Sequence, residues 1–181
     1  MLSTRRTLLL SHRVGLQLRA VASLVGFDEQ SIAAAGASLR AGELVAFPTE
    51  TVYGLGADAL NATAVQRIFV AKGRPNTDPL IVHVTGTEAI WQLSSGSALA
   101  RSVCSALCGA FWPGPLTIIY RASACVPLLV TAGTGFVGLR SPQHPTARAL
   151  LSAAGVPVAA PSANRFGHVS PTCAQHVLDD L

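Results

Sequence analysis

The chain has 181 residues, of which 50% are hydrophobic and 12% are charged, enough apolar material for one globular domain. This composition excludes a disordered chain and a coiled coil. No apolar run approaches the ~20 residues that a membrane-spanning helix needs. The formal net charge is +4, but residues 28–181 hold nine basic and nine acidic residues. The positive excess belongs to residues 1–27, so it gives little support to a folded nucleic-acid-binding face.

Residues 1–27 form a basic N-terminal leader that contains four arginines and no acid. Arginine mixed with serine, threonine and leucine is the composition of a mitochondrial presequence. The alternative is an ordinary basic N-terminus, which leaves the protein in the cytoplasm. We therefore expect a mitochondrial or cytoplasmic protein whose folded domain spans residues 28–181.

Helix-type and strand-type apolar periodicity alternate after the leader, which predicts an α/β domain. Ser31 and Asn61 are the expected N-caps of the first two helices, and Gly73 is expected to end the second. In chain order, we expect a helix at 31–41, a strand at 44–47, a helix at 62–72, a strand at 80–84, a helix at 99–111, strands at 116–120 and 136–139, a helix at 146–154, a strand at 158–160 and the start of a helix at 172–181.

The helix expected at 99–111 carries apolar residues at helical spacing along one stripe. The stripe consists of Leu99, Val103, Leu107 and Phe111. Cys104 and Cys108 lie four residues apart on the same helix, but no further Cys or His pair completes a metal site. We expect buried thiols at these two positions. Cys125 and Cys173 form no paired pattern either, so free cysteines and no bound metal are predicted.

Four loop segments gather polar residues, and loops commonly hold functional groups on a rigid scaffold. The first, residues 48–56, reads Pro-Thr-Glu-Thr-Val-Tyr-Gly-Leu-Gly and follows the first strand. We interpret it as one turn that brings hydroxyls, a carboxylate and glycines together. Gly54 and Gly56 do not make a dinucleotide loop, because the third glycine is missing and the segment does not open a helix.

The second segment, residues 72–80, begins with Lys72, Gly73 and Arg74. Pro75 favours extended backbone at Arg74, and two cations at alternate positions of an extended stretch point to the same side, which suits neighbouring phosphates. The alternative is a basic helix end that complements the helix dipole. Lys72 is the only lysine of the chain. A preference for arginine codons is the main explanation, and a need for a compact ammonium group at this site is the alternative.

The third and fourth segments follow later strands. Arg140 ends an apolar strand, where a guanidinium either pairs with an acid or binds an anion, and the neighbouring sequence offers no acid. Ser162 and Asn164 share one side of a loop that follows a strand and precedes a helix, a common ligand crevice in open α/β sheets. The alternative is a local turn in which these side chains bond the backbone. His83 is, on its own, more typical of a core histidine than of a ligand.

Together these segments resemble the YrdC-like family, the threonylcarbamoyl-AMP synthases that act in tRNA modification. The resemblance rests on Lys72-x-Arg74, Ser162-x-Asn164 and the ordered blocks Pro-Thr-Glu-Thr-Val-Tyr-Gly-Leu, Phe-Trp-Pro-Gly-Pro-Leu-Thr and Arg-x-Pro-x-His-Pro, and it covers residues 28–181. It implies a twisted mixed parallel/antiparallel sheet flanked by helices, with a concave ligand site. It also implies a nucleotidyl transfer in which L-threonine, bicarbonate and ATP give threonylcarbamoyl-AMP and pyrophosphate.

The same resemblance implies roles for individual residues. Lys72 and Arg74 would be catalytic residues that hold the phosphates. The further ATP contacts would be Asp78, Asn164, Ser170 and Thr172, and the threonine site would be Thr51, His83, Arg140 and Ser162, with Arg140 on the amino acid carboxylate. ATP is expected as a substrate with Mg²⁺, and a tRNA threonylcarbamoyl transferase as the downstream partner. Tyr53 and Thr117 lie in family motifs without an assigned role.

The chain departs from the family pattern at three places. Asp78 stands where asparagine is common, and Arg165 and Phe166 replace smaller residues after Asn164. The family pattern continues with a segment that completes the sheet and includes a Ser-Thr pair, so we expect the domain to be incomplete at its C-terminus.

Two other functions fit the sequence. Related modules serve carbamoyl transfer through carbamoyl-adenylate, although these usually sit in larger multidomain chains. From a different class, the acid-free stretch between Glu88 and Asp179 would suit a non-catalytic double-stranded RNA or tRNA-binding surface, whose binding would depend strongly on salt.

Overall fold

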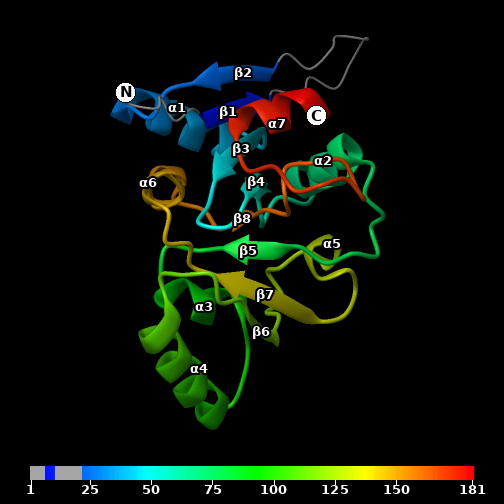
Figure 1. Cartoon of the computed structure of the whole chain (residues 1–181). Coiled ribbons are helices and arrows are strands. Elements are labelled where there is room, and N and C mark those ends of the chain that lie inside the picture. The colour runs from blue at the N-terminus through cyan, green and yellow to red at the C-terminus, as the bar shows by residue number, and fades with distance from the viewer. Residues whose placement is uncertain (1–6, 11–21) are drawn as a thin grey trace.

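The computed structural model describes residues 7–10 and 22–181 (Figure 1). The strands are β1 (Thr7–Leu10), β2 (Ala22–Val25), β3 (Leu44–Pro48), β4 (Tyr53–Asp58), β5 (Ile81–His83), β6 (Ile118–Arg121), β7 (Phe136–Arg140) and β8 (Val158–Ala159). The helices are α1 (Glu29–Arg40), α2 (Ala62–Lys72), α3 (Glu88–Leu93), α4 (Ala98–Phe111), α5 (Leu128–Thr131), α6 (Pro145–Ala154) and α7 (Ala174–Asp180). None of these helices has the length and apolar character that a membrane crossing requires.

The strands form one sheet in the order β2-β1-β3-β4-β8-β5-β7-β6. β5 and β7 run parallel, and the other neighbouring pairs among the described residues run antiparallel. The expectation of a mixed sheet flanked by helices is confirmed. Because β5 and β7 are parallel and in register at His83 and Arg140, these two predicted site residues lie side by side at the same end of the sheet.

Strand β4 overturns the interpretation of residues 48–56 as a single turn. The turn covers residues 49–52, and the glycines after it lie in β4, which pairs with β3. Gly56 is needed there, because a Cβ atom would lie 2.8 Å from Val158 Cγ1 and 2.9 Å from Phe47 Cε1. The sequence did not predict this strand because it contains Gly54 and Gly56, and glycine is normally unfavourable in a strand interior. The rejection of a dinucleotide loop is consistent with this position.

The helix caps are partly as expected. Asn61 accepts hydrogen bonds from the backbone N–H groups of Thr63 and Ala64, and Gly73 ends α2 with φ of 60°. The first helix begins earlier than predicted, because the carboxylate of Asp28 accepts the N–H of Ser31 and is the N-cap. Asp28 directly precedes the first helical residue, where a side chain can cap the helix, whereas Ser31 already lies within the first turn.

Part of the leader belongs to the sheet. β1 pairs with β2 and with β3, in the register Leu8↔Ala46. The remaining residues of the leader, 1–6 and 11–21, lie outside the described residues, and the presequence stays a prediction. Helices α3 and α5 were not predicted, since each has six residues or fewer and too little periodicity to detect.

Two apolar clusters cover opposite sides of the sheet. One lies beneath α1 and α6 and includes Phe47 and Val158. Gly36 lets these helices approach closely, because a Cβ atom there would lie 2.7 Å from the carbonyl carbon of Ala153. The larger cluster includes buried residues of α2, β4, β5 and α4.

Helix α4 extends below β6 and β7, at the opposite end of the molecule from the C-terminus (Figure 1). Its apolar stripe of Leu99, Val103, Leu107 and Phe111 is exposed, and Cys104 and Cys108 face the core instead. The prediction of buried thiols at these two positions is confirmed, and all four cysteines are free.

Candidate active site

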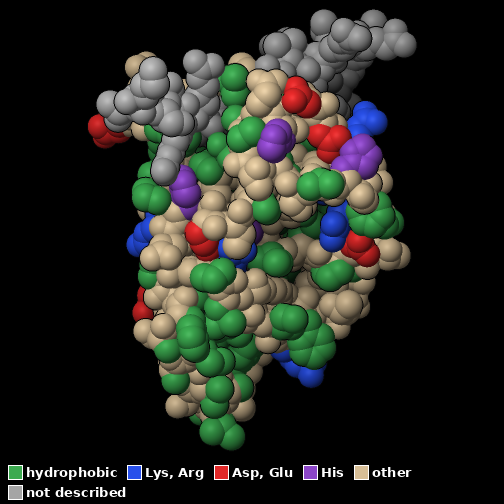
Figure 2. Space-filling view, in the orientation of Figure 1, with side chains coloured by type: hydrophobic (Ala, Val, Ile, Leu, Met, Phe, Trp, Pro, Cys, Tyr) green, Lys and Arg blue, Asp and Glu red, His purple; other side chains and the backbone are tan. Residues whose placement is uncertain are grey.

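The predicted site residues come together where several loops meet. These loops are the turn at 49–52, the ends of β5 and β7, the end of α2 and the segment at 161–172. The space-filling view shows this face hollowed near its middle, with basic side chains next to acidic ones on both sides of the hollow (Figure 2). A concave site between charged groups fits the expected ligand crevice.

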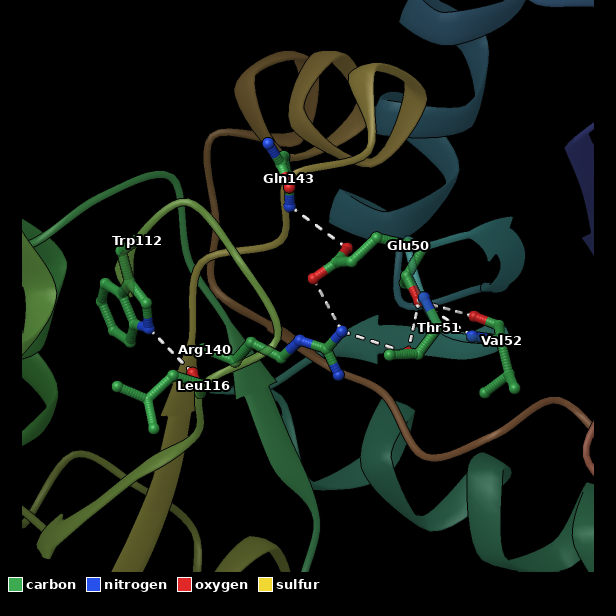
Figure 3. A network of polar contacts seen from close by, with 8 residues as sticks. Glu50, Thr51, Val52, Trp112, Leu116, Arg140 and Gln143 are labelled. Carbon is green, nitrogen blue, oxygen red and sulfur yellow. Dashed lines mark hydrogen bonds and ion pairs between the residues drawn. The ribbon is translucent and has the colours of Figure 1, made fainter. Parts of the chain in front are cut away.

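Arg140 reaches from the end of β7 to the turn at 49–52 (Figure 3). Its Nη2 atom donates to Glu50 Oε1 at 2.7 Å and to Thr51 Oγ1 at 3.1 Å. The other carboxylate oxygen of Glu50 accepts the backbone N–H of Gln143 at 3.1 Å. The expectation that Arg140 has no acid nearby is therefore wrong in space, because Glu50 lies 90 positions away in the sequence.

The charge of Arg140 is partly balanced by this contact. Burial would raise the pKa of Glu50, but the hydrogen bond and the charge of Arg140, with the N–H of Gln143, lower it overall. Glu50 is therefore ionised at neutral pH and holds the guanidinium in place. Arg140 Nε is buried without a hydrogen-bond partner, so this side chain retains donor capacity toward a ligand.

His83 lies next to Arg140 in the parallel register of β5 and β7. It is buried, and its ring meets the ring of Phe47 edge-on at 6.0 Å between centroids. Burial, and then the charge of Arg140, lower the pKa of His83 to about 4, so the ring is neutral at physiological pH. His83 is therefore a core histidine by packing and a neighbour of the predicted threonine residues by position.

Lys72 is the last residue of α2 and is only 3% exposed. Its Nζ atom donates to the backbone carbonyls of Ser162 and Asn164. Burial, followed by the charge of Arg74, lowers the pKa of Lys72 to about 8. Lys72 is helical, as the helix predicted at 62–72 requires. The interpretation of Lys72 and Arg74 as alternate positions of one extended stretch is wrong, because Gly73 turns the chain between them through a left-handed conformation.

Arg74 lies just beyond this turn and does not share a hydrogen-bond partner with Lys72. Its Nη2 atom donates to the Pro79 carbonyl at 3.2 Å and lies 3.6 Å from Asp78 Oδ2. Its guanidinium carbon lies 5.7 Å from the centre of the Phe166 ring. Two residues that depart from the family pattern, Asp78 and Phe166, thus both lie next to Arg74.

Ser162 and Asn164 follow β8 and extend the sheet beside β4. Ser162 forms a bridge with Gly54, and the N–H of Ala163 donates to the carbonyl of Tyr53 at 2.8 Å. Asn164 is buried, and its Nδ2 donates to the carbonyls of Arg165 and His168 at 2.7 and 2.8 Å. The local-turn interpretation is therefore correct for the amide nitrogen of Asn164, whereas its buried Oδ1 has no partner.

The other predicted residues lie further along or apart. Ser170 and Thr172 are exposed on the segment whose Pro171 carbonyl accepts the N–H of Tyr53 at 2.8 Å. Ser170 lines a cavity of about 560 Å³ next to α7. Thr117 lines a different, mostly apolar cavity of about 530 Å³, to which none of the predicted ATP or threonine residues contributes.

The Phe-Trp-Pro-Gly-Pro-Leu-Thr block, residues 111–117, is bonded to the chain next to Arg140. The N–H of Gly114 donates to the carbonyl of Ser141 at 2.7 Å, and Trp112 Nε1 donates to the carbonyl of Leu116 at 2.8 Å (Figure 3). Sequence reasoning missed Glu50 as a site residue. Its place in the first motif block, directly before Thr51, was the signal that could have identified it.

Buried polar atoms without a hydrogen-bond partner concentrate at this site. Among the described residues they are Arg74 Nε, His83 Nδ1, Arg140 Nε, Asn164 Oδ1, Arg67 Nε and Tyr120 Oη. The first four belong to residues predicted to bind ATP or threonine. Such orphaned groups are rare in folded proteins and often mark functional positions. Residues 7–10 and 22–181, which the structure describes, contain no group of three or more His, Cys, Asp or Glu residues arranged to hold a metal ion.

Comparison with known proteins adds independent findings. Residues 37–181 match the sequence model of the Sua5/YciO/YrdC family, described as telomere recombination. The chain is 50% identical over 156 residues to the threonylcarbamoyl-AMP synthase of Bacillus subtilis, and 46% identical over 157 residues to that of Pyrococcus abyssi. Each match covers 85% of this chain but 44% of the relative, so the chain spans less than half the length of these proteins.

A solved structure is similar as well. The crystal structure of P. abyssi Sua5 complexed with L-threonine has 46% sequence identity and a TM-score of 0.81. The match covers 84% of this chain and 44% of that chain. The fold expected from the sequence is therefore found in a solved relative.

Proposed function

Because this chain belongs to the Sua5/YciO/YrdC family, we propose that it is an L-threonylcarbamoyl-AMP synthase, a nucleotidyltransferase that serves threonylcarbamoyl-adenosine formation in tRNA. The names of the relatives from B. subtilis and P. abyssi support this activity, as does the threonine complex of the latter. They favour it over carbamoyl transfer through carbamoyl-adenylate.

The reaction has two parts. The amine of threonine combines with bicarbonate to give a carbamate and water, and a carbamate oxygen then attacks the α-phosphorus of ATP as pyrophosphate leaves. This transfer needs positioning and charge neutralisation more than a side-chain nucleophile. Lys72 and Arg74 neutralise the phosphates, while Arg140, with Thr51 beside it, receives the carboxylate of threonine.

The single observation that carries the proposal is the set of orphaned atoms on Arg74, His83, Arg140 and Asn164. Three are donors or potential donors suited to anionic oxygens, and Asn164 Oδ1 is an acceptor suited to an N–H or O–H group. A ligand with phosphates, a carboxylate and several N–H or O–H groups satisfies such a mixed set. ATP together with threonine has this chemistry.

A magnesium ion fits as a companion of ATP rather than as a resident metal. Mg²⁺ usually needs only one or two protein carboxylates in addition to phosphate oxygens and water. Asp78, next to Arg74 and partly exposed, is the carboxylate that would hold it. The ion would supply further neutralisation of phosphate charge.

The proposal extends to partners and place of action. The unstable acyl adenylate must be consumed by an enzyme that transfers the threonylcarbamoyl group to tRNA, so a tRNA threonylcarbamoyl transferase is the downstream partner. The arginine-rich, acid-free composition of residues 1–27 supports a mitochondrial location, with the cytoplasm as the alternative.

Pyrophosphate release by the full chain tests the proposed activity. The assay contains ATP, Mg²⁺, L-threonine and bicarbonate, and each co-substrate is omitted in turn. Release that needs both threonine and bicarbonate, with threonylcarbamoyl-AMP identified by its mass, is the expected result. A folded protein that releases no pyrophosphate contradicts the proposal, and salt-sensitive binding of double-stranded RNA by such a protein would favour the RNA-binding alternative.

A further inference from the structure

The segment at 164–168 links the two motifs on which the proposed function depends. Asn164 supplies a carbonyl to Lys72, and the N–H of Phe166 donates to the carbonyl of Lys72 at 2.8 Å. The Phe166 ring then lies against Arg74. A displacement of this segment would therefore move the acceptors and the aromatic ring that surround both predicted phosphate-binding cations.

Asp180 holds the outer side of this segment. Its Oδ2 atom accepts the backbone N–H of Arg165 at 2.7 Å, and its Oδ1 atom forms a hydrogen bond with His168 Nδ1 at 2.6 Å. Within the segment, Asn164 Nδ2 donates to the carbonyls of the same two residues. Arg165 and His168 are thus each bonded both to Asp180 and to Asn164.

We propose that Asp180 is a positioning residue that holds the segment at 164–168 against Lys72 and Arg74, and so determines the affinity for ATP. This inference rests on the proposed function for its ligand, but not for the contacts that carry it. Asp180 lies in α7, and its carboxylate makes two hydrogen bonds to the 164–168 segment.

The electrostatics agree with this arrangement. The hydrogen bond from His168, followed by that from the Arg165 N–H, lowers the pKa of Asp180, so the carboxylate stays charged. The charge of Asp180 also acts on Lys72 and favours its protonated form, against the effects of burial and Arg74. Asp180 thereby supports both the position and the charge of the phosphate-binding group.

Asp179 is a matched control on the same helix. Its carboxylate accepts a hydrogen bond from Gln175 at 2.7 Å and makes no hydrogen bond to the described segment 164–168. We expect Asp180→Ala to raise KM for ATP about tenfold and to change KM for threonine by less than about twofold. Asp179→Ala is expected to leave both constants unchanged. Equal increases in both constants, or equal effects of the two variants, would overturn the proposal.

Asp180→Asn tests positioning against general stability. The amide oxygen still accepts the Arg165 N–H, so this variant is expected to recover most of the ATP affinity that Asp180→Ala loses. Loss as large as in the alanine variant contradicts the positioning role.

Hydrogen exchange of the backbone amides at 165–168 in the ligand-free protein separates this inference from the proposed function. Faster exchange in Asp180→Ala than in Asp179→Ala supports the anchoring role even in a chain without synthase activity, and equal exchange refutes it. A wild-type chain that binds no ATP would contradict the proposed function and the ligand part of this inference together.

Discussion

The two cationic ends of the site differ in how their charge is compensated. Arg140 contacts the ionised carboxylate of Glu50, whereas Lys72 contacts only the backbone carbonyls of Ser162 and Asn164. Among the described residues, no ion pair joins Lys72 to an acid. Carbonyl dipoles orient an ammonium group without neutralising it, and the pKa of Lys72 is accordingly lowered to about 8 by burial.

This difference indicates a division of labour. A buried cation that forms no ion pair with a carboxylate would favour the proposed ligand with the greatest negative charge, the triphosphate of ATP. A guanidinium that already shares its charge with Glu50 recognises a single carboxylate more by geometry than by net charge. The family resemblance implies that Lys72 binds phosphates and Arg140 binds threonine, and this contrast is consistent with both proposed roles.

The largest expected effect is that of Lys72→Met. Methionine keeps the apolar stem but removes the charge, so we expect pyrophosphate release to fall by about 1,000-fold, the upper range for losing a group that stabilises developing charge. Arg67→Met is the matched control, because Arg67 lies on the same helix and donates to the Gly42 carbonyl instead. A folded Lys72→Met protein with wild-type turnover would show that the charge of Lys72 is not needed for the reaction.

The neutral state of His83 beside Arg140 predicts an acid-sensitive fold. The folded-state pKa of about 4 lies below the ordinary value of 6.5, so the unfolded chain binds the proton more tightly. The contribution of neutral His83 to the free energy of unfolding is therefore fully present above pH ~6.5. It is lost as the pH decreases toward 4, which lowers the free energy of unfolding by up to about 3 kcal/mol. Urea unfolding between pH 7 and 4 measures this slope.

The His83 prediction has a matched control in His176, which is exposed. His83→Asn is expected to flatten the pH dependence, while His176→Asn leaves it unchanged. Identical slopes in the wild type and His83→Asn would show that His83 does not cause the acid sensitivity.

Substitution of Arg140 tests the proposed threonine-binding role of this residue, as Lys72→Met tests the phosphate-binding role of Lys72. We expect Arg140→Gln to raise KM for threonine about tenfold, the loss of one charge-assisted hydrogen bond, and to change ATP affinity by less than about threefold. Glu50→Gln keeps hydrogen-bonding capacity and is expected to have the smaller effect. Steady-state kinetics with each substrate varied separately checks this, and parallel losses for both ligands would contradict the division of labour.

The smallest expected effect is a proton uptake. A phosphate next to Lys72 favours the ammonium form, so ATP binding raises a pKa that starts at about 8. At pH ~8.5 we expect uptake of between about half and three quarters of a proton, since about three quarters of the free side chains are then neutral. Calorimetry in two buffers of different ionisation enthalpy measures it, and the same uptake in Lys72→Met would exclude Lys72 as its source.

Helices α2 and α4 illustrate how far the sequence pattern reaches. Both carry apolar residues at helical spacing, and the extent of both helices was predicted closely. Val65 and Ile68 of α2 are buried, but Leu99 of α4 is 77% exposed. Periodicity reports which residues share a face, and not whether another element covers that face. That depends on where the helix lies relative to the sheet.

The candidate site shows the same limit. The motif residues Lys72, Arg140, Ser162 and Asn164 could be chosen from the sequence, because their residue types and spacing resemble a family. Their partners could not. Glu50 is 90 positions from Arg140, and Ser162 is 90 positions from Lys72, so each contact depends on strand order and register.

Features governed by neighbours within one helical turn were therefore within reach of the sequence, as the Asn61 cap and the Gly73 end of α2 demonstrate. Their hydrogen bonds join residues only a few positions apart, and those residues alone fix the geometry. Folding of the whole chain was needed to balance Arg140 with a carboxylate, to leave Lys72 with carbonyls, and to bring Asp180 to Arg165. The compensation of a buried charge depends on every group that the fold brings near it, and most of those groups are distant in sequence.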